Sequence, residues 1–372
     1  MNETLQALMR QATQLTQSGR LAEATQAIQR ALHGGAADTA LHPEPEATHR
    51  QDSPLILDGC VFEVDARNTN TTGTGDFTRG MHTHATLTRG FKLYVPPGQA
   101  GRSLPLVVML HGCTQNPDDF AAGTGMNERA REQGFCVLYP EQSQDANPSR
   151  CWNWFKHNHQ QRGRGEPALL ASMTQMVIQK HGMDARRVFV AGLSAGGAMA
   201  AIVAGAYPEI FAAVGVHSGL PSGSASNVAE AMMVMKSGEA GISMPGKGPG
   251  FGAARTAAPQ AHTPTAVPTI VFHGDQDQTV HPRNGEKVIA AALGSATTPA
   301  STAGSARVEQ GVSARGRRYT RAIHQSAQGQ VMAEHWVVHG AGHAWSGGDA
   351  KGSYTDAQGP DATREMLRFF LV

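Results

Sequence analysis

The sequence is short of cysteine, of net charge and of long apolar runs. Its 372 residues include four cysteines, too few for a disulfide-built scaffold, so we expect mostly reduced, buried thiols. A formal net charge of +1 provides no basic field, which excludes nucleic acid as an expected partner. No stretch approaches the roughly 20 consecutive apolar residues of a membrane span, so we expect no transmembrane segment. The four cysteines are Cys60, Cys113, Cys136 and Cys151.

The N-terminal residues also lack the basic and apolar regions of a secretory signal. The chain begins Met1-Asn2-Glu3-Thr4-Leu5-Gln6. On this pattern we expect a cytoplasmic protein.

The chain divides by composition into three parts. Residues 1–33 carry apolar side chains at helical spacing on both sides of Ser18-Gly19-Arg20, which predicts a helical hairpin. One hairpin cannot bury its own apolar face, so it must dock on the body, on a second chain or on a hydrophobic surface. Residues 34–53 lack periodicity and resemble a flexible linker. The main folded body is expected over residues 54–372.

Strands and helices alternate through this body, which predicts an α/β fold with a mostly parallel central sheet flanked by helices. This is the layout of an α/β-hydrolase. Residues 221–267 are too long for an ordinary connection and are interpreted as a lid or substrate loop with a helix over Val228–Lys236. Residues 293–315 are predicted to be a mobile loop. The expected strands are 90–95, 105–110, 136–139, 187–191, 212–217, 269–273 and 333–339, and the expected helices are 118–133, 168–181, 195–207, 285–293 and 362–371.

The pentapeptide Gly192-Leu193-Ser194-Ala195-Gly196 follows one apolar run and precedes a stretch of small residues. This context is typical of a nucleophile elbow, in which glycines let a strand and a helix approach and the serine projects into a cleft. Ser194 is therefore the candidate nucleophile.

A serine nucleophile needs a base and a carboxylate that orients the base. Asp275 and Asp277 both follow the predicted strand 269–273, and the His-Gly-x-x-Asp spacing favours Asp277. Among seventeen histidines, His343 is the candidate base because it follows the last predicted strand in a loop of small residues. Both assignments keep the order serine, aspartate, histidine expected of this fold.

Oxyanion donors are expected at two backbone amides, those of Ala195 and Cys113. Thr114 and Gln115 would then contact substrate, or could instead cap the following helix. Cys113 itself could be a thiol nucleophile, but no base accompanies it. No metal or other cofactor is expected, because the histidines near His157-Asn158-His159 lack further ligands.

Seven motifs follow one another in order along the chain. They are Leu110-His111-Gly112-Cys113-Thr114-Gln115, Tyr139-Pro140-Glu141-Gln142, Cys151-Trp152-Asn153-Trp154-Phe155, Gly165-Glu166-Pro167, Gly192-Leu193-Ser194-Ala195-Gly196-Gly197, His217-Ser218-Gly219 and Gly340-Ala341-Gly342-His343-Ala344-Trp345-Ser346-Gly347-Gly348. Together they resemble the motifs of the polyhydroxybutyrate depolymerase family of esterases, and the resemblance extends from about Gly90 to Val372.

The resemblance implies an α/β-hydrolase fold, a triad of Ser194, Asp277 and His343, and an oxyanion hole at Cys113 and Ala195. It also suggests that Cys113 and Cys151 lie close together, as a disulfide in exported relatives. Because no export signal is seen, we expect reduced thiols here. Trp152, Trp154 and Trp345 would line a polymer groove under this interpretation, or else lie in the core.

The chain departs from secreted family members, which carry a signal peptide and a C-terminal polymer-binding module. It resembles an intracellular member, and the hairpin 1–33 would then contact polymer granules. The expected activity is hydrolysis of polyhydroxybutyrate or a related short-chain polyester, favoured by the apolar Met232, Met233 and Met235. Feruloyl or acetylxylan esterase activity is the alternative, since related motifs serve both. A non-catalytic granule adaptor is a third interpretation.

Overall fold

The computed structural model describes residues 73, 75–98, 101–239, 267–294 and 306–371. The chain divides into two compact units, Met1–Pro54 and Leu55–Val372. The predicted hairpin and linker, and residues 240–266 of the predicted lid, lie outside the described residues. Within the described ranges, no helix combines the length and the apolar character needed to cross a membrane.

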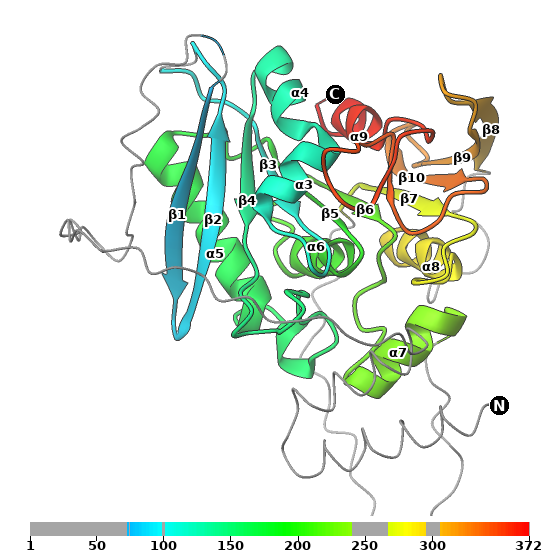
Figure 1. Cartoon of the computed structure of the whole chain (residues 1–372), viewed down its shortest axis with the longest axis horizontal. Coiled ribbons are helices and arrows are strands. Elements are labelled where there is room, and N and C mark those ends of the chain that lie inside the picture. The colour runs from blue at the N-terminus through cyan, green and yellow to red at the C-terminus, as the bar shows by residue number, and fades with distance from the viewer. Residues whose placement is uncertain (1–72, 74, 99–100, 240–266, 295–305, 372) are drawn as a thin grey trace, which may run out of the picture. The chain divides into compact units, whose positions relative to one another are not determined.

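A ten-stranded sheet forms the centre of the second unit (Figure 1). Its strand order is β1-β2-β4-β3-β5-β6-β7-β10-β9-β8. The strands from β4 to β10 in this order run parallel, whereas β1, β2, β8 and β9 pair antiparallel. The strands are β1 (Asp76–His84), β2 (Leu87–Val95), β3 (Leu106–Leu110), β4 (Cys136–Pro140), β5 (Val188–Leu193), β6 (Ala213–His217), β7 (Thr269–Gly274), β8 (Arg307–Val312), β9 (Arg318–Gln325) and β10 (Val331–Val338).

Helices cover both faces of this sheet (Figure 1). Every residue of β3 is buried, and alternate side chains enter opposite cores. Leu106, Val108 and Leu110 belong to the core cluster that includes residues of α5, α6 and α8, whereas Val107 and Met109 belong to the cluster that includes residues of α3, α4 and α9. The helices are α3 (Pro117–Thr124), α4 (Met126–Gln133), α5 (Gly165–His181), α6 (Ala195–Ala206), α7 (Val228–Ser237), α8 (Arg283–Ala292) and α9 (Ala362–Phe370), with a 3₁₀ turn η1 (His157–His159). A second, two-stranded sheet pairs β11 (Trp345–Ser346) with β12 (Thr355–Asp356).

Two local predictions were wrong. The expected helix 118–133 is two helices, because Gly125 adopts φ 61° and at once ends α3 and begins α4. The segment 293–315, predicted as a mobile loop, contains β8, which pairs with β9 at the edge of the sheet. Val308 and Val312 of β8 are about three-fifths exposed, at 60% and 61%. An edge strand with so little burial has no apolar pattern to reveal it.

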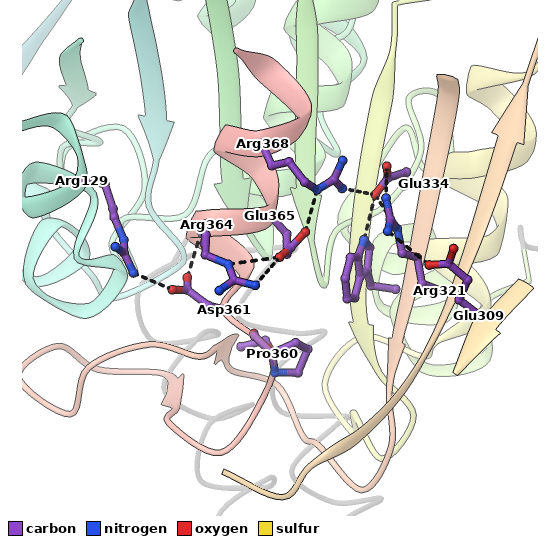
Figure 2. A network of polar contacts seen from close by, with 11 residues as sticks. Arg129, Glu309, Arg321, Glu334, Pro360, Asp361, Arg364, Glu365 and Arg368 are labelled. Carbon is purple, nitrogen blue, oxygen red and sulfur yellow. Dashed lines mark hydrogen bonds and ion pairs between the residues drawn. The ribbon is translucent and has the colours of Figure 1, made fainter. Parts of the chain in front are cut away.

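A cluster of ion pairs fastens the C-terminal helix to the sheet (Figure 2). The carboxylate of Glu334 on β10 is fully buried and accepts bonds of 2.6 Å from both Arg321 and Arg368. The indole of Trp336 donates to the same carboxylate at 3.1 Å. At the start of α9, Asp361 pairs with Arg129 at 2.9 Å. The cluster therefore joins α9 to β9, β10 and α4.

Candidate active site

Ser194 lies at the sharp turn between β5 and α6. Its backbone adopts φ 57° and ψ −119°, a conformation that side-chain-bearing residues rarely adopt. A Cβ on Gly196 would overlap the carbonyl oxygen of Leu110 in β3, so only glycine allows α6 to begin this close to the neighbouring strand. The turn is that of a nucleophile elbow.

Asp277 and His343 meet although they come from different loops. The Oδ2 atom of Asp277 lies 2.7 Å from Nδ1 of His343. The other oxygen, Oδ1, accepts bonds from the amides of Thr279 and Val280 at 2.9 and 2.8 Å, which fixes the carboxylate. The structure thus brings His343 to Asp277.

Asp275, the competing carboxylate, has a different partner. It accepts the amide of Gly340 at 2.7 Å and lies 2.9 Å from Nδ1 of His339. Asp275 therefore holds the start of the loop that carries His343.

The charge of Asp277 is strongly stabilised. Burial opposes it, but hydrogen bonds from His273 and His343 and from the amide of Val280 outweigh burial and hold the pKa of the carboxyl far below its usual range. Nε2 of His273 lies 3.4 Å from Oδ2 of Asp277 and 2.8 Å from the carbonyl of Val280. An ionised Asp277 keeps the proton of His343 on Nδ1 and leaves Nε2 free to act as a base.

The loop after β3 lies beside the serine. A Cβ placed on Gly112 would lie 3.7 Å from the Cβ of Ser194. Among the described residues, no hydrogen bond engages the amide of Cys113 or that of Ala195. The Ala195 amide also lies at the positive end of the α6 dipole. Both amides are thus available to an oxyanion at Ser194.

Cys113 and Cys151 form a disulfide, with 4.2 Å between their Cα atoms. The expectation of two reduced thiols was therefore wrong, whereas the pairing suggested by the family resemblance is present. The bond ties the loop that carries Cys113 to the segment after β4, and the amide of Thr114 also donates to Ser149 in that segment at 2.7 Å. With its sulfur in a disulfide, Cys113 has no thiolate for nucleophilic attack.

His217, at the end of β6, joins the serine turn to the histidine loop. Its carbonyl accepts the amide of Ser194 at 2.9 Å, and its Nε2 accepts the amide of Ser346 at 2.9 Å. Burial, together with the nearby His273 and His343, lowers the pKa of His217 to about 3, so its ring stays neutral. Apart from the place of His217 at the end of a predicted strand, no sequence motif indicates this double contact.

All three tryptophans considered for a polymer groove lie in the core. Trp152, Trp154 and Trp345 are 0%, 4% and 1% exposed, and the indole of Trp345 donates to Thr363 at 3.0 Å. Gln115 is also buried, and its Oε1 accepts the amide of Gly112 at 2.9 Å. In this structure none of the four presents a surface to a polymer. Of the expected substrate contacts only Thr114 is exposed.

Tyr354 is an exposed aromatic residue that the sequence did not single out. It is 47% exposed, and its hydroxyl lies 3.1 Å from Oγ1 of Thr114, next to Cys113. Tyr354 and Thr114 both adopt positive φ values, 52° and 66°. Such strained backbone conformations concentrate at functional sites. The pair forms an exposed edge beside the candidate oxyanion loop.

The site contains no cluster suited to a metal. Across the described ranges, no group of three or more histidine, cysteine, aspartate or glutamate side chains is arranged to hold an ion. His159 lies 3.4 Å from the buried Glu166 and is thus part of an internal polar contact.

The parallel sheet, the serine turn after β5 and the histidine loop after β10 define the α/β-hydrolase class. The family model described as "Esterase PHB depolymerase" matches residues 89–310. The chain therefore belongs to this family of esterases.

Individual relatives agree with this membership. Poly(3-hydroxyalkanoate) depolymerase C of Paucimonas lemoignei is 29% identical over 67% of this chain and 57% of its own length. Feruloyl esterase B of Thermothelomyces thermophilus is 29% identical over 53% of this chain and 67% of its own length. The match thus spans about three-fifths of the length of these two relatives. The solved acetyl xylan esterase from Aspergillus awamori has the same fold, with a TM-score of 0.51 and 22% identity over 76% of this chain and 93% of that one.

Proposed function

We propose that this protein is a serine esterase that hydrolyses polyhydroxybutyrate, or a related short-chain polyhydroxyalkanoate, through an acyl-enzyme. One observation carries the proposal. Asp277 and His343 form a 2.7 Å pair, and His217 bonds both to the strained turn of Ser194 and to Ser346 in the loop that carries His343. A hydroxyl, an oriented imidazole and unengaged amides are the groups that acyl transfer needs.

In the proposed reaction, the hydroxyl of Ser194 attacks the ester carbonyl while Nε2 of His343 accepts its proton. The amides of Cys113 and Ala195 stabilise the oxyanion, and the protonated His343 then donates to the departing alcohol. Water, deprotonated by the same imidazole, cleaves the acyl-enzyme and restores Ser194. Asp277 stays ionised throughout and holds the imidazole in place.

The proposed substrate class is supported by the family and by the Paucimonas lemoignei relative, whose name specifies a polyhydroxyalkanoate. Val228, Met232 and Met233 on α7 are between 40% and 56% exposed and add an adaptable apolar surface that suits a polyester. The second candidate is a feruloyl or acetylxylan ester, because relatives named for both activities match at similar identity.

The test compares products released from amorphous polyhydroxybutyrate, methyl ferulate and acetylated xylan. We expect soluble hydroxybutyrate oligomers from the first and much slower release from the others. Faster release of ferulate or acetate would show that the competing ester, and not the polyester, is the preferred substrate.

Cleavage of p-nitrophenyl butyrate tests catalysis itself. We expect the Ser194→Ala variant to lose it by about 10⁴-fold or more, because the nucleophile acts together with its base. A parent protein without activity would support the non-catalytic adaptor. A Cys113→Ala variant retains the backbone amide but loses the disulfide, so its turnover should remain dependent on Ser194 at a reduced kcat.

We further propose that residues 1–33 contact stored polymer granules through their apolar stripe. The motivation is the 3.6-residue spacing of leucines that one hairpin cannot bury alone. Deleting residues 1–50 should reduce binding to granules while p-nitrophenyl butyrate cleavage continues. Unchanged granule binding would contradict this role.

Two features favour different cellular locations for the protein. Contact with stored granules would require a cytoplasmic location, whereas the Cys113–Cys151 disulfide favours an oxidising compartment. Thiol trapping of the protein in intact cells separates the two. Alkylation of both cysteines before any reduction supports the cytoplasm, and their protection until reduction supports an oxidising compartment.

A further inference from the structure

Tyr354 links the two loops that carry the candidate oxyanion donor and the base, yet it has no part in the mechanism above. Its hydroxyl lies 3.1 Å from Oγ1 of Thr114, the residue after Cys113. Its carbonyl accepts the amide of Trp345 at 2.7 Å, two residues after His343. The side chain and the backbone of Tyr354 are therefore bound to different loops of the candidate site.

The hydrogen bonds of Thr114 define which hydroxyl donates to which. Its Oγ1 donates to the carbonyl of Cys113 at 2.6 Å. A hydroxyl has a single proton, so Tyr354 is the donor in the 3.1 Å contact with Thr114. The phenol is thus tethered through its proton, and it offers a substrate its ring and the lone pairs of its oxygen.

The backbone on both sides of Tyr354 is fixed by hydrogen bonds. The amide of Ser353 donates to Oδ1 of Asp119 at 2.8 Å, and its hydroxyl donates to Oδ2 at 2.5 Å. The carbonyl of Ser353 accepts Nε2 of Gln115 at 3.1 Å. These contacts, with the bond to Trp345, hold Tyr354 at φ 52°, in the left-handed region. A strained conformation that the surroundings impose on an exposed aromatic residue points to a function for its ring.

The ring of Tyr354 faces solvent. It is 47% exposed, whereas the other phenylalanine, tyrosine and tryptophan side chains that the structure describes are buried or half-buried. A large apolar ring whose orientation is already fixed loses little conformational entropy when a ligand packs on it. Tyr354 therefore presents a preorganised contact surface beside the candidate site.

The two loops that Tyr354 joins hold different oxygens of the ester in the proposed reaction. The carbonyl oxygen lies at the Cys113 amide, and the leaving oxygen lies at Nε2 of His343. The alcohol part of the ester extends from the leaving oxygen, whereas the acyl chain extends from the carbonyl carbon. The side of the site that Tyr354 occupies is therefore that of the departing alcohol.

We propose that Tyr354 is a specificity-determining residue: its ring packs against the alcohol part of the ester, which in a polyester is the next repeat of the chain. The inference rests on the proposed esterase activity. At a constant acyl group, it predicts that the enzyme prefers esters of bulky, apolar alcohols to esters of methanol.

Three substitutions separate the ring from its tether and from its backbone. Tyr354→Asn removes the ring and introduces a residue that tolerates a positive φ, and Tyr354→Gly removes the whole side chain. Tyr354→Phe retains the ring and loses only the bond to Thr114. Met81→Asn is the matched control, because Met81 is an apolar residue, 39% exposed, on β1 at the edge of the sheet.

The first measurement is kcat/KM for benzyl butyrate and for methyl butyrate, which differ only in the alcohol. We expect the benzyl-to-methyl ratio to fall by about tenfold or more in Tyr354→Asn and Tyr354→Gly, the scale of one lost apolar contact. Tyr354→Phe should keep the ratio within about threefold of the parent, and Met81→Asn should leave it unchanged. Methyl hexanoate lengthens the acyl chain instead, and its kcat/KM relative to methyl butyrate should follow the parent in every variant.

The second measurement is the rate of deacylation, followed in single turnovers of p-nitrophenyl butyrate. The acyl-enzyme has already lost its alcohol, so loss of the ring should change this rate by less than about threefold. A ring that only held the two loops together would slow acylation and deacylation alike. Such a joint fall, an unchanged benzyl-to-methyl ratio, or a loss that follows the acyl chain would overturn the proposal. If Tyr354→Asn fails to fold, Tyr354→Gly decides.

The proposed function fails by a different result. It fails if the parent hydrolyses none of these esters or if Ser194→Ala remains active, whereas the inference on Tyr354 fails only in an active parent whose preference for the alcohol does not depend on the ring.

Discussion

Asp277 and His343 share a 2.7 Å hydrogen bond although they are 66 positions apart in the chain. Neighbouring contacts explain how the two loops meet. The amide of Gln276 donates to the carbonyl of Ala341 at 3.0 Å, and a Cβ on Gly274 would overlap the same carbonyl. The close approach of the two backbones after β7 and β10 therefore accompanies the side-chain contact and brings the two loops within its reach.

Replacing the carboxylate of Asp277 with an amide tests that contact. In Asp277→Asn the side chain can donate to Nδ1 of His343, which favours the wrong tautomer of the base. We expect kcat for p-nitrophenyl butyrate to fall by roughly 10³–10⁴-fold. Asp275→Asn is the control, because Asp275 faces His339, and its kcat should stay within about tenfold of the parent. A larger fall in kcat for Asp275→Asn than for Asp277→Asn would show that Asp275 is the carboxylate on which catalysis depends.

Acid should destabilise the protein through its buried histidines. The pKa of His111 is about 4 when folded, below the ordinary value of 6.5, so the unfolded chain binds a proton that the native ring does not. The free energy of unfolding therefore falls as the pH falls from about 6.5 to about 4, by about 2 kcal/mol for this ring at about pH 5. Urea unfolding at pH 7 and at about pH 5 measures the difference.

A variant isolates the contribution of His111 to this pH dependence. His111→Asn should lose about 2 kcal/mol of the stability change between the two pH values. His157→Asn, which removes an exposed histidine, should behave like the parent. Identical pH dependence in the parent and both variants would contradict a neutral, buried His111.

Removing the disulfide should cost stability and turnover together. Cys113 and Cys151 are 38 positions apart, and a cross-link of this kind stabilises a fold by about 2–4 kcal/mol. The double variant Cys113→Ala, Cys151→Ala should unfold at lower urea and have a lower kcat, because the loop that presents the Cys113 amide loses one anchor. Dithiothreitol should reproduce the effect in the parent and add nothing in the double variant.

Cys136 supplies the control for the effect of dithiothreitol. Its thiol is free and buried, and burial raises its pKa to about 12. Cys136→Ala should respond to dithiothreitol as the parent does. A parent whose stability is unaffected by dithiothreitol, with the bond demonstrably reduced, would contradict a structural role of the disulfide.

The ion-pair cluster of Figure 2 should affect stability without affecting chemistry. Glu334→Gln leaves two guanidinium groups beside a neutral side chain, and we expect a loss of about 3–5 kcal/mol with kcat unchanged. Glu309→Gln, at the exposed end of the cluster, should cost less than about 1 kcal/mol. Equal losses in the two variants would show that burial of Glu334 contributes nothing.

Much of the sheet could be predicted because its central strands are buried on both faces and form apolar runs. β3, β5, β6 and β7 all begin or end within two residues of their predicted bounds. β1, β8 and β9 were not predicted, because they lie at the edges and their side chains are largely exposed or half-buried. Pattern alone cannot recover strands that pair through their backbones.

The candidate site likewise combines features that local sequence motifs predict with features that depend on contacts between distant segments. Ser194, Asp277 and His343 could be proposed from their places after predicted strands. The side of the molecule that Trp152 and Trp345 face depends on packing between distant segments, so composition could not decide it. The contacts of Gln142 and Glu166 likewise join segments that no local motif connects.

His217 gives the serine turn and the histidine loop a common point of reference. Ser194 carries the nucleophile, and Ser346 lies in the same loop as the base, His343. If separate elements positioned these two serines, their displacements would be independent, and together they would change the distance between nucleophile and base. Because both bond to one residue, a shift of β6 carries them in the same direction and their separation changes less. A misplacement of about 1 Å can cost about 10²-fold in rate, so a shared anchor makes the distance between nucleophile and base tolerant of motion in the strand that sets it.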